Sequence, residues 1–492
     1  MSIQTTISPH NQQPYVSRTH PLPHDLDATI QKAAAAQKEW AAVSLEKRIA
    51  IGRQFIVSPS LSSPMRPPLN ERSQKEIEAM KEDIPLELTL QMGRPVSQGA
   101  GEVRGLLERS NYLLDIAASS LADVSLADTD KPGFKRYIKR VPLGVVFVIA
   151  PWNFPYLTTV NSVIPAIIAG NAVLLKPSPQ TPITAERFAI ALTRAGLPEN
   201  VLQVLHLSPE LASNVIEHPS VNFVSFTGSV AVGRVIAETA AKADGFTGSA
   251  LELGGKDPAY VAPDADLDYT AAELVDGAFF NSGQSCCAIE RIYVHEAVYD
   301  QFVAKVVEIT KKYRLGDPTS TETNLGPVVS LASAEKIRKQ VADAVKQGAK
   351  ALVPEDLFAT AQAGTAFVAP QVLVDVDHTM DVMTEETFGP VIGIQKVKSD
   401  DEAIALMNDS RYGLTASVWT NVEANPASEE TFLKFVDKLE TGTVFLNRCD
   451  YLDPALSWVG VKNSGRGVSL SKFGYDQLTR PKSVHMKIKT ST

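Results

Sequence analysis

Cysteine and histidine are scarce in this chain, and their scarcity excludes two kinds of architecture. The 492 residues include three cysteines and eight histidines. Three thiols cannot build a disulfide framework, so we expect a protein of a reducing compartment, the cytoplasm. The histidines are scattered, with none in an HExxH motif and none paired with a cysteine at metal-ligand spacing. We therefore expect no metal site.

An excess of basic residues is also missing. The chain carries 47 lysines and arginines against 56 acidic residues, a net charge of −9. A nucleic-acid partner is not expected, because binding phosphates requires a basic surface. Residues 141–175 contain no charged residue, but Pro151, Asn153 and Pro155 interrupt this apolar run. A membrane helix needs about 20 predominantly apolar residues in succession, so we expect no membrane span.

The familiar phosphate-binding fingerprints are absent or incomplete. There is no GxGxxG, and FTGSVAVGR (226–234) has the glycine spacing of a P-loop without its Lys-Ser/Thr ending. ATP binding through this segment is therefore not expected. A helix that starts just after Gly228 and Ser229 would still present free N–H groups to an anion. The alternative interpretation of these two residues is an ordinary tight turn.

An alternation of apolar strands and helices begins at Val145. Strands are predicted over 145–150, 172–176, 201–207 and 221–226, and helices over 158–170, 183–196, 211–218 and 229–243. This pattern predicts an α/β fold with a parallel sheet, whose ligands bind where the strands end. Further strands are predicted over 291–295, 364–376, 390–397, 417–421 and 442–447, with a helix over 401–409. Helical segments over 29–56 and 70–93 flank a loop rich in proline and serine at 57–69.

Two of the three cysteines are adjacent, in FFNSGQSCCAIE (279–290). The small residues around Cys286 allow a substrate to approach, as a catalytic thiol requires. The commoner fate of a free cysteine is burial as a small apolar residue. The local sequence leaves both interpretations open for Cys286 and Cys287.

Two further polar residues stand in apolar surroundings. Glu252 lies within LELGGK (251–256), where a carboxylate is costly unless it is functional or paired, for example with Lys256. Asn153 lies in PWNFP at a predicted strand end, where its amide could donate to an oxyanion or simply form a turn.

Together these stretches resemble the aldehyde dehydrogenase superfamily, in the order and at the spacing typical of that family. The resemblance covers about residues 25–488. It rests on PWNFP (151–155), KPSPQTP (176–182), FTGS (226–229), LELGGK (251–256), NSGQSC (281–286), ETFGPV (386–391) and VKNSGRG (461–467).

The resemblance implies a chemistry for the polar residues. Cys286 is the implied nucleophile, and Cys287 is its structural neighbour. The oxyanion is held by the Asn153 amide and the Cys286 N–H, and Glu252 activates the water that hydrolyses a thioester to a carboxylic acid. The substrate implied is a small-molecule aldehyde.

The resemblance also implies NAD or NADP as cofactor. Its implied ligands are Lys176 at the adenosine ribose, Ser229 after Gly228 at the pyrophosphate, Glu386 at the nicotinamide ribose, Phe388 beside the ring, and Trp152 in the tunnel wall. Many NAD-preferring relatives have a glutamate where this chain has Pro179. Because proline does not repel a 2′-phosphate, we expect both cofactors to be used.

Alternatives to a broad-substrate enzyme stay open. The motifs also resemble succinate-semialdehyde-specific relatives. An acyl-CoA-forming enzyme is disfavoured because Glu252 is present. A thiol esterase that uses Cys286 and Glu252, or a non-catalytic relative, would have less use for the cofactor residues.

By resemblance the fold has a Rossmann-type coenzyme domain (1–118 and 143–252), an α/β catalytic domain (253–455) and a β oligomerisation flap (119–142 and 475–492). FKRYIKRVP (134–142) and SVHMKIK (483–489) alternate like edge strands, so we expect a homodimer or homotetramer. The loop at 57–69 interrupts a helix that is continuous in the family. It is either a tolerated insertion or an unremoved intron in the gene model.

Overall fold

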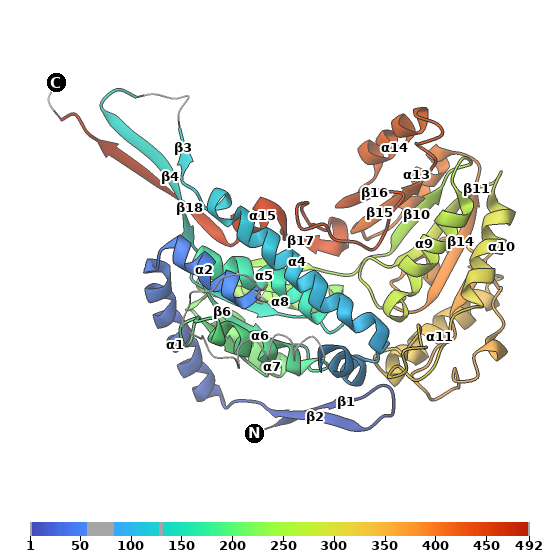
Figure 1. The fold of residues 1–492 in the computed structure, drawn as a ribbon, viewed down its shortest axis with the longest axis horizontal. Helices are drawn as coiled ribbons and strands as arrows, with labels where there is room; N and C mark the ends of the chain where they lie inside the picture. Colours follow the sequence, from blue (N-terminus) through green and yellow to red (C-terminus); the bar gives the residue numbers. More distant parts are fainter. Residues whose placement is uncertain (1, 57–82, 127–130, 491–492) are drawn as a thin grey trace, which may run out of the picture.

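The computed structural model describes residues 2–56, 83–126 and 131–490. The 57–69 loop, with its two interpretations, lies outside the described residues, and so does the predicted helical stretch 70–82. The rest forms two α/β units side by side, with a long two-stranded ribbon that projects from one of them (Figure 1).

The first unit is built on a six-stranded sheet with the strand order β17-β9-β8-β5-β6-β7. All neighbours are parallel except the edge pair of β17 and β9. The strands are β5 (Val145–Ile149), β6 (Ala172–Lys176), β7 (Leu202–Val204), β8 (Val221–Thr227), β9 (Gly248–Glu252) and β17 (Gly465–Arg466). The four predicted strands are confirmed as β5 to β8, although β7 is shorter than the sequence predicts.

Helices cover both faces of this sheet, which is why β5 and β6 are buried along their whole length. Alternate strand residues pack against α5 (Pro155–Ala169) and α6 (Pro182–Arg194) on one face. The others pack against α7 (Pro209–Glu217) and α8 (Val230–Lys242) on the opposite face. The uncharged run 141–175 is thus mainly the unit β5-α5-β6. Among the described residues, no helix is long and apolar enough to cross a membrane.

The N-terminal region adds helices to this unit. The predicted helix 29–56 is two helices, α1 (Pro23–Ala42) and α2 (Leu45–Ile56), because Val43 leaves the helical conformation at φ −71° and ψ 136°. Residues 83–92 are helical, and α4 (Val96–Ser120) follows. A hairpin of β1 (Ile3–Ile7) and β2 (Pro14–Thr19), which the sequence analysis did not predict, precedes α1.

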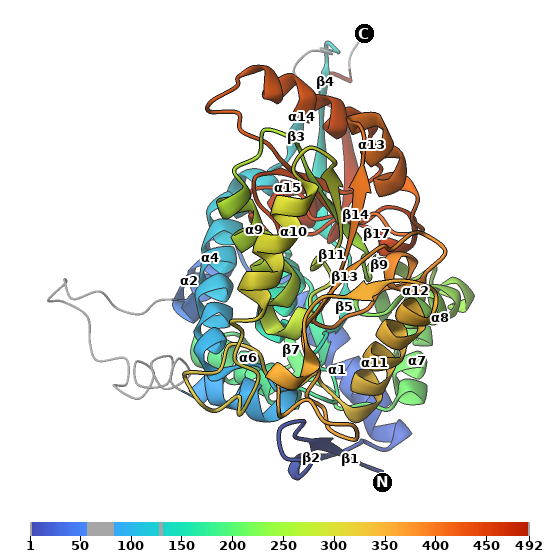
Figure 2. The same ribbon diagram turned by 90° about the vertical axis from the view of Figure 1, so that its right-hand side faces the viewer.

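The second unit is a seven-stranded sheet with the order β12-β13-β14-β11-β10-β15-β16. Helices α9 and α10 pack on one face, and α11, α13 and α14 on the other (Figures 1 and 2). The elements are β10 (Asp257–Val261), α9 (Leu267–Phe279), β11 (Ile289–His295), α10 (Tyr299–Thr310), α11 (Leu331–Lys346), β12 (Lys350–Ala351), β13 (Gln371–Val374), α12 (Asp381–Thr384), β14 (Val391–Val397), α13 (Asp400–Asn408), β15 (Thr415–Trp419), α14 (Ala427–Lys438) and β16 (Thr443–Leu446).

One predicted strand of this unit is too long. The sequence predicts a strand over 364–376, but only β13, from Gln371 to Val374, pairs with a neighbour. Gly364 adopts φ +77°, which a regular strand does not use, and Pro370 has no N–H to donate to a ladder.

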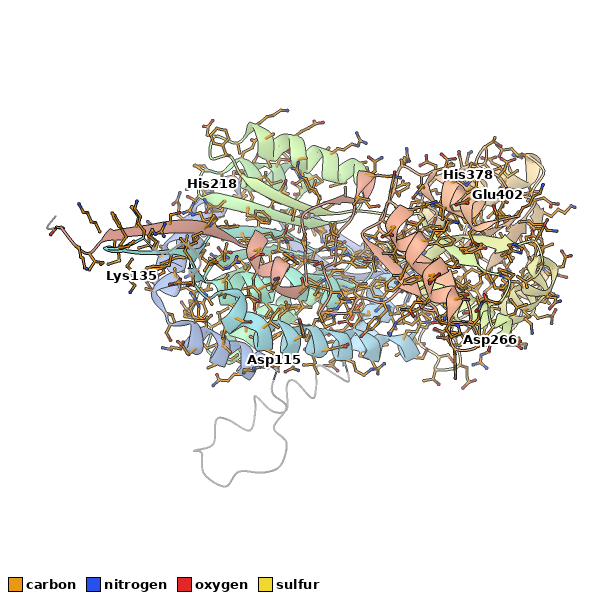
Figure 3. All side chains as sticks on the ribbon, turned by 90° about the horizontal axis from the view of Figure 1, so that it is seen from above. Asp115, Lys135, His218, Asp266, His378 and Glu402 are labelled. Atoms are coloured by element: carbon orange, nitrogen blue, oxygen red, sulfur yellow. The ribbon has the colours of Figure 1, made fainter. Side chains whose placement is uncertain are left out.

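The projecting ribbon consists of β4 (Phe134–Pro142) and β18 (Thr479–Lys487). They form an antiparallel ladder from Phe134 opposite Lys487 to Pro142 opposite Thr479, and the short β3 (Val124–Ser125) flanks β4. Figure 3 shows Lys135 near the far end of this ribbon, away from the two sheets. β18 is an edge strand as predicted, whereas β4 lies between β18 and β3 and has a free edge only where the short β3 does not reach. The role of the ribbon in assembly, like the domain boundaries, stays a prediction.

Candidate active site

Two cavities meet between the two sheets, and Cys286 and Glu252 line both of them. The first, of about 370 Å³, is lined on its helical side by α4 and α9, and Trp458 also lines it. The second, of about 590 Å³, is lined by the ends of β5, β6 and β8. Among the described residues, four line both cavities: Cys286, Glu252, Thr227 and Leu253. These residues therefore form the passage between the cavities.

The segment before Cys286 is held in an unusual backbone conformation. After α9 the chain enters a 3-10 turn, η1 (Phe280–Gly283), in which Asn281 and Ser282 have φ of 53° and 59°. Gly283 continues at φ +72°, and a Cβ there would come within 2.2 Å of the Gly389 carbonyl oxygen. Left-handed backbone in residues other than glycine costs about 1–3 kcal/mol each and occurs preferentially at functional sites. The turn brings Cys286 to the wall of both cavities.

The two cysteines have different surroundings. Cys286 is half-buried, whereas Cys287 is 2% exposed and donates its thiol hydrogen to Asp450 Oδ1 at 3.0 Å. Ser285 Oγ donates to the same oxygen at 2.8 Å. Burial raises the pKa of Asp450 to about 6. Asp450 was not predicted from the sequence, although it follows the end of strand β16, where polar site residues are expected.

Glu252 ends strand β9, opposite Thr227 of β8 and Gly465 of β17. Thr227 Oγ1 donates to Glu252 Oε2 at 3.2 Å. Burial raises the pKa of Glu252, so its carboxyl group takes up a proton more readily than an exposed glutamate. The alternative pairing of Glu252 with Lys256 is wrong, because Lys256 is ion-paired with Glu290.

Asn153 is 5% exposed and follows the end of β5. Its Nδ2 donates to the Gln284 carbonyl at 3.2 Å, which ties the PWNFP segment to the turn before Cys286. The Asn281 amide makes the same link, donating to the Asn153 carbonyl at 3.3 Å and to the Gln284 carbonyl at 3.2 Å. Asn153 and Cys286 are thus brought to one site from different sheets.

A buried arginine completes this link. Arg94 is 1% exposed, donates Nη2 to the Asn153 carbonyl, and donates Nε to Asn281 Oδ1 at 3.1 Å. Its Nη1 lies 2.8 Å from Glu102 Oε1 in an ion pair whose side chains are both buried. Glu102 Oε2 in turn accepts backbone N–H groups at the start of α5. The sequence analysis did not identify this pair.

The second cavity contains the six residues predicted to contact the cofactor. Lys176 is 8% exposed, and burial lowers its pKa to about 8. Ser229 caps the N-terminus of α8 by accepting from Val232 N–H at 3.4 Å. The cavity is lined by Trp152, Lys176, Gly228, Ser229, Glu386 and Phe388.

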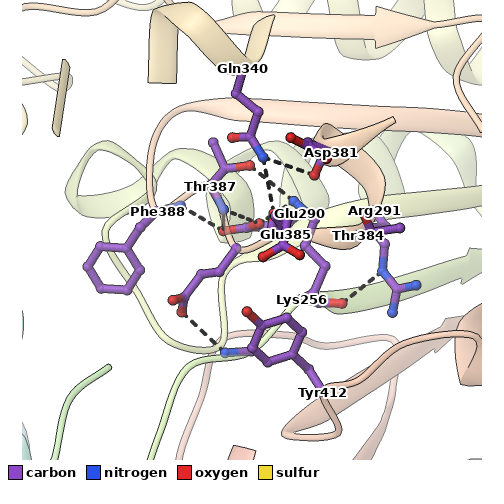
Figure 4. Close-up of polar contacts among 12 residues, drawn as sticks. Lys256, Glu290, Arg291, Gln340, Asp381, Thr384, Glu385, Thr387, Phe388 and Tyr412 are labelled. Carbon is purple, nitrogen blue, oxygen red and sulfur yellow. Dashed lines mark hydrogen bonds and ion pairs between the residues drawn. The ribbon is translucent and has the colours of Figure 1, made fainter. Parts of the chain in front are cut away.

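Glu386 and Phe388 lie on a loop that Glu290 holds from beneath. The Glu290 carboxylate accepts the N–H groups of Thr387 and Phe388 at 2.9 Å each and pairs with Lys256 (Figure 4). Glu386 Oε1 accepts Gly255 N–H at 3.2 Å. Burial raises the pKa of Glu386 to about 7.

Chemically, the site combines a reachable thiol and a carboxylate of raised pKa at the junction with an amide donor, Asn153, in the adjoining wall of the second cavity. A helix N-terminus and a buried lysine line the adjoining cavity, where an anionic ligand would be favoured. The described residues contain no group of three or more metal-ligating side chains. The arrangement suits covalent chemistry at a carbonyl beside a phosphate-bearing cofactor.

Comparison with known proteins agrees with the family resemblance seen in the sequence. The model of the "Aldehyde dehydrogenase family" matches residues 60–484. A succinate-semialdehyde dehydrogenase [NADP(+)] of Mycobacterium avium is 36% identical over 416 residues, 83% of this chain and 84% of the relative. Human retinaldehyde dehydrogenase 3 is 36% identical over 353 residues, 72% of this chain and 67% of the relative.

Solved structures of similar fold cover nearly the whole chain. The succinic semialdehyde dehydrogenase of Streptococcus pyogenes, in complex with NADP+, matches with a TM-score of 0.88 at 27% identity, covering 98% of this chain and 100% of that one. The NADP-dependent glyceraldehyde-3-phosphate dehydrogenase of Bacillus halodurans matches with a TM-score of 0.88 at 29% identity, covering 99% and 96%.

Proposed function

Because the chain belongs to the aldehyde dehydrogenase family and is therefore an oxidoreductase acting on aldehydes, we propose that it forms a carboxylic acid through a thioester on Cys286. The observation that carries this proposal is the position of Cys286 and Glu252 at the junction of two cavities. An aldehyde in the first cavity and a dinucleotide in the second would both reach the sulfur. Neither reactant needs to leave its cavity.

Cys286 supplies the nucleophile. Its sulfur, as thiolate, attacks the aldehyde carbon and forms a tetrahedral thiohemiacetal with a negatively charged oxygen. The Asn153 amide and the Cys286 N–H are the donors for that oxygen. Asn153 Nδ2 carries two hydrogens, of which the Gln284 carbonyl accepts one. The other is left for the substrate.

The second cavity fits NAD or NADP. Lys176, Ser229 and Glu386 all line it. In this proposal Lys176 donates to ribose hydroxyls, the N-terminus of α8 at Ser229 binds the pyrophosphate, and Glu386 accepts from the second ribose. Phe388 and Trp152, whose rings are 5.5 Å apart, provide an apolar wall. When bound, the nicotinamide accepts the hydride that leaves the thiohemiacetal carbon. We propose that both cofactors are used, because Pro179 places no carboxylate in this cavity.

Glu252 completes the cycle as general base. The carboxylate removes a proton from a water molecule, which then attacks the thioester carbonyl and releases the acid from Cys286. A raised pKa suits this task, because it makes the ionised carboxylate a stronger base. The Thr227 hydroxyl orients one carboxylate oxygen.

A semialdehyde-specific enzyme is the narrower version of this proposal. It is favoured by the similarity to succinate-semialdehyde dehydrogenases and by the buried cation Arg109 in the wall of the first cavity. We also propose three domains: a coenzyme domain (1–118 and 143–252), a catalytic domain (253–455) and a flap (119–142 and 475–492). In the proposed homodimer or homotetramer, β4 and β18 form the assembly surface. We propose the cytoplasm as its location.

A cysteine-replacement experiment tests the function. NAD(P)H formation from butanal is measured for the natural protein and for the matched variants Cys286→Ser and Cys287→Ser. The account expects Cys286→Ser to lose at least about 10⁴-fold in kcat, as for other covalent nucleophiles, and Cys287→Ser to keep measurable turnover. Ester hydrolysis that needs no nucleotide, in the absence of any aldehyde oxidation, would favour the thiol esterase instead.

A further inference from the structure

Arg109 is a buried cation that forms no ion pair with any of the described residues. It lies on α4, is 6% exposed, and lines the first cavity together with Cys286. Its Nη1 donates to the Leu157 carbonyl at 2.6 Å and to Asn161 Oδ1 at 3.4 Å, and both acceptors are uncharged. Burial lowers the pKa of Arg109, and the more distant carboxylates of Glu102, Glu252 and Glu108 offset only part of that shift.

Arg94 shows the contrast within the same cavity wall. Its guanidinium is paired with Glu102, and all three of its nitrogens have acceptors. In Arg109, by comparison, Nε and Nη2 have no hydrogen-bond acceptor among the described residues. Burying a cation is costly unless a counter-charge or hydrogen bonds compensate for the lost water. The free donors of Arg109 at the cavity wall are therefore suited to bind an anionic ligand.

Asn161 provides an independent observation at the same place. It lies on α5, is 2% exposed, and also lines the first cavity. Its Oδ1 is occupied by Arg109, and its Nδ2 is buried without any hydrogen-bond acceptor. An amide nitrogen left in this way is uncommon in folded proteins and needs an explanation. Arg109 Nε and Nη2 and Asn161 Nδ2 are thus donors without acceptors, on two residues that contact each other.

We propose that Arg109 and Asn161 bind the carboxylate of a substrate that carries an aldehyde at its other end. This inference rests on the proposed function and assigns its substrate class, a short aldehyde acid. A carboxylate supplies the missing negative charge and enough lone pairs for a guanidinium and an amide. With its carboxylate held there, a short chain presents its aldehyde carbon to Cys286 in the same cavity.

The opposite charges in the cavity define the rival substrate. Six acidic residues also line it, namely Glu102 and Glu108 of α4, Glu252, Glu273 and Asp276 of α9, and Asp450. Glu102 is compensated by its ion pair with Arg94, and the others would repel a carboxylate that pointed toward them. A substrate acid is therefore directed toward Arg109, whereas an amino-bearing aldehyde would be attracted to α9. The two classes are separated by substrates of equal chain length and different terminal charge.

The test compares kcat/KM for succinic semialdehyde, butanal and 4-aminobutanal. In the natural enzyme succinic semialdehyde is expected to be the best of the three. Arg109→Gln should lower its kcat/KM by about 30-fold or more, mainly through KM, because one partner of a buried charged hydrogen bond is removed. The kcat/KM for butanal should change by less than about threefold, within the range of an indirect effect. Arg104→Gln, which removes an exposed arginine from the same cavity, is the matched control.

A second variant guards against a failure of Arg109→Gln to fold. Asn161→Asp gives Arg109 an internal counter-ion, so the preference for succinic semialdehyde should also disappear. Binding is followed without turnover by asking whether succinate slows alkylation of Cys286 by iodoacetamide. Protection is expected in the natural protein and should be lost in both variants.

The possible failures are distinguishable. If butanal is oxidised but the ratio of succinic semialdehyde to butanal is unchanged in both variants, the inference is overturned and the proposed function stands. A natural preference for 4-aminobutanal overturns it as well. If no aldehyde is oxidised, the proposed function fails. Protection by succinate then decides separately whether Arg109 and Asn161 form a carboxylate site.

Discussion

Glu290 and Lys256 form a buried ion pair directly beneath the loop that carries Glu386 and Phe388. The same carboxylate fixes the backbone of Thr387 and Phe388, and Phe388 has a left-handed φ of 56°. Lys256 also donates to Thr387 Oγ1 at 3.0 Å. The pair therefore links the strand that follows Cys286 to the wall of the second cavity, and it holds a strained residue in place.

Glu290→Gln should weaken cofactor binding. The neutral amide cannot pair with Lys256 and keeps only one acceptor oxygen for two N–H groups, so the loop loosens. We expect the Kd for NADP to rise about tenfold, the equivalent of about 1.4 kcal/mol, measured by quenching of tryptophan fluorescence. The unfolding free energy should fall by about 3–5 kcal/mol, as when one partner of a buried pair is removed.

Glu308→Gln is the control for this variant, because Glu308 pairs with Lys311 at the surface. Its stability should change by no more than about 0.5 kcal/mol, and its NADP affinity should not change. An unaltered Kd in Glu290→Gln, despite lower stability, would leave the ion pair a purely structural role.

Arg94→Lys should slow the addition of Cys286 to an aldehyde without changing the intrinsic reactivity of its sulfur. Lysine keeps a cation beside Glu102, yet it cannot reach Asn153 and Asn281 with a planar fork of donors. We expect kcat/KM for aldehydes to fall about tenfold or more, short of the about 10²–10³ of losing an oxyanion donor outright. Alkylation of Cys286 by iodoacetamide forms no oxyanion, so its rate should be unchanged.

A double-variant cycle with Asn153→Ala separates the two explanations for such a loss. If Arg94 acts through Asn153, the double variant is hardly slower than Asn153→Ala alone. Losses that multiply would show that the two residues act independently.

Pro179→Glu should convert the cofactor preference. Pro179 lines the second cavity close to Lys176 and Ser178 in the chain, and a carboxylate there would repel a 2′-phosphate. We expect kcat/KM with NADP to fall about tenfold or more, and that with NAD to fall by less than about threefold. Equal losses with both cofactors would mean that the 2′-phosphate does not lie near residue 179.

Glu252 makes the rate of thioester hydrolysis depend on pH. The base acts only when ionised, and burial raises the pKa of Glu252 above its ordinary value of 4.5. The rate of deacylation should therefore rise with pH through that elevated pKa, and Glu252→Gln should remove this limb. The kcat of the variant should fall about 10²–10⁴-fold, measured over a series of pH values.

The same shift in pKa has a consequence for stability. A carboxyl group whose pKa is raised by folding contributes stability below its unfolded pKa, and loses that contribution as pH rises through the folded pKa. Ionised Glu252 thus destabilises the fold at neutral pH. Glu252→Gln should have the higher Tm at about pH 8, and the difference should shrink as the pH falls toward 4.5.

The sequence predicted the repeated strand-helix units well, because β5 to β8 are short apolar runs bounded by proline and glycine. Cys286, Glu252 and Asn153 were identified because each stands in a compact motif. Their convergence on one junction agrees with the resemblance on which their roles depend. The β1–β2 hairpin was missed because its strands lie mostly exposed and lack an apolar face.

Residues whose role depends on contacts with residues far away in the sequence could not be identified from local motifs. In the sequence Arg94 and Glu102 look like ordinary charged residues, and only their buried contacts show that Arg94 holds Asn281 and Asn153. Arg109 is one of many arginines in the chain, and its unpaired state is visible only when its surroundings are known. Asp450 follows a strand end, but its contacts with Ser285 and Cys287 span more than 160 residues.

The central claim is that a substrate acyl group is attached to the sulfur of Cys286 before water removes it. The most direct measurement incubates Glu252→Gln with butanal and NADP, then locates the added mass by fragmenting the peptide that contains both Cys286 and Cys287. The account predicts one butyryl group, on Cys286, in an amount that matches the first NADPH formed. A butyryl group on Cys287, or NADPH formation with no acylated cysteine, would contradict it.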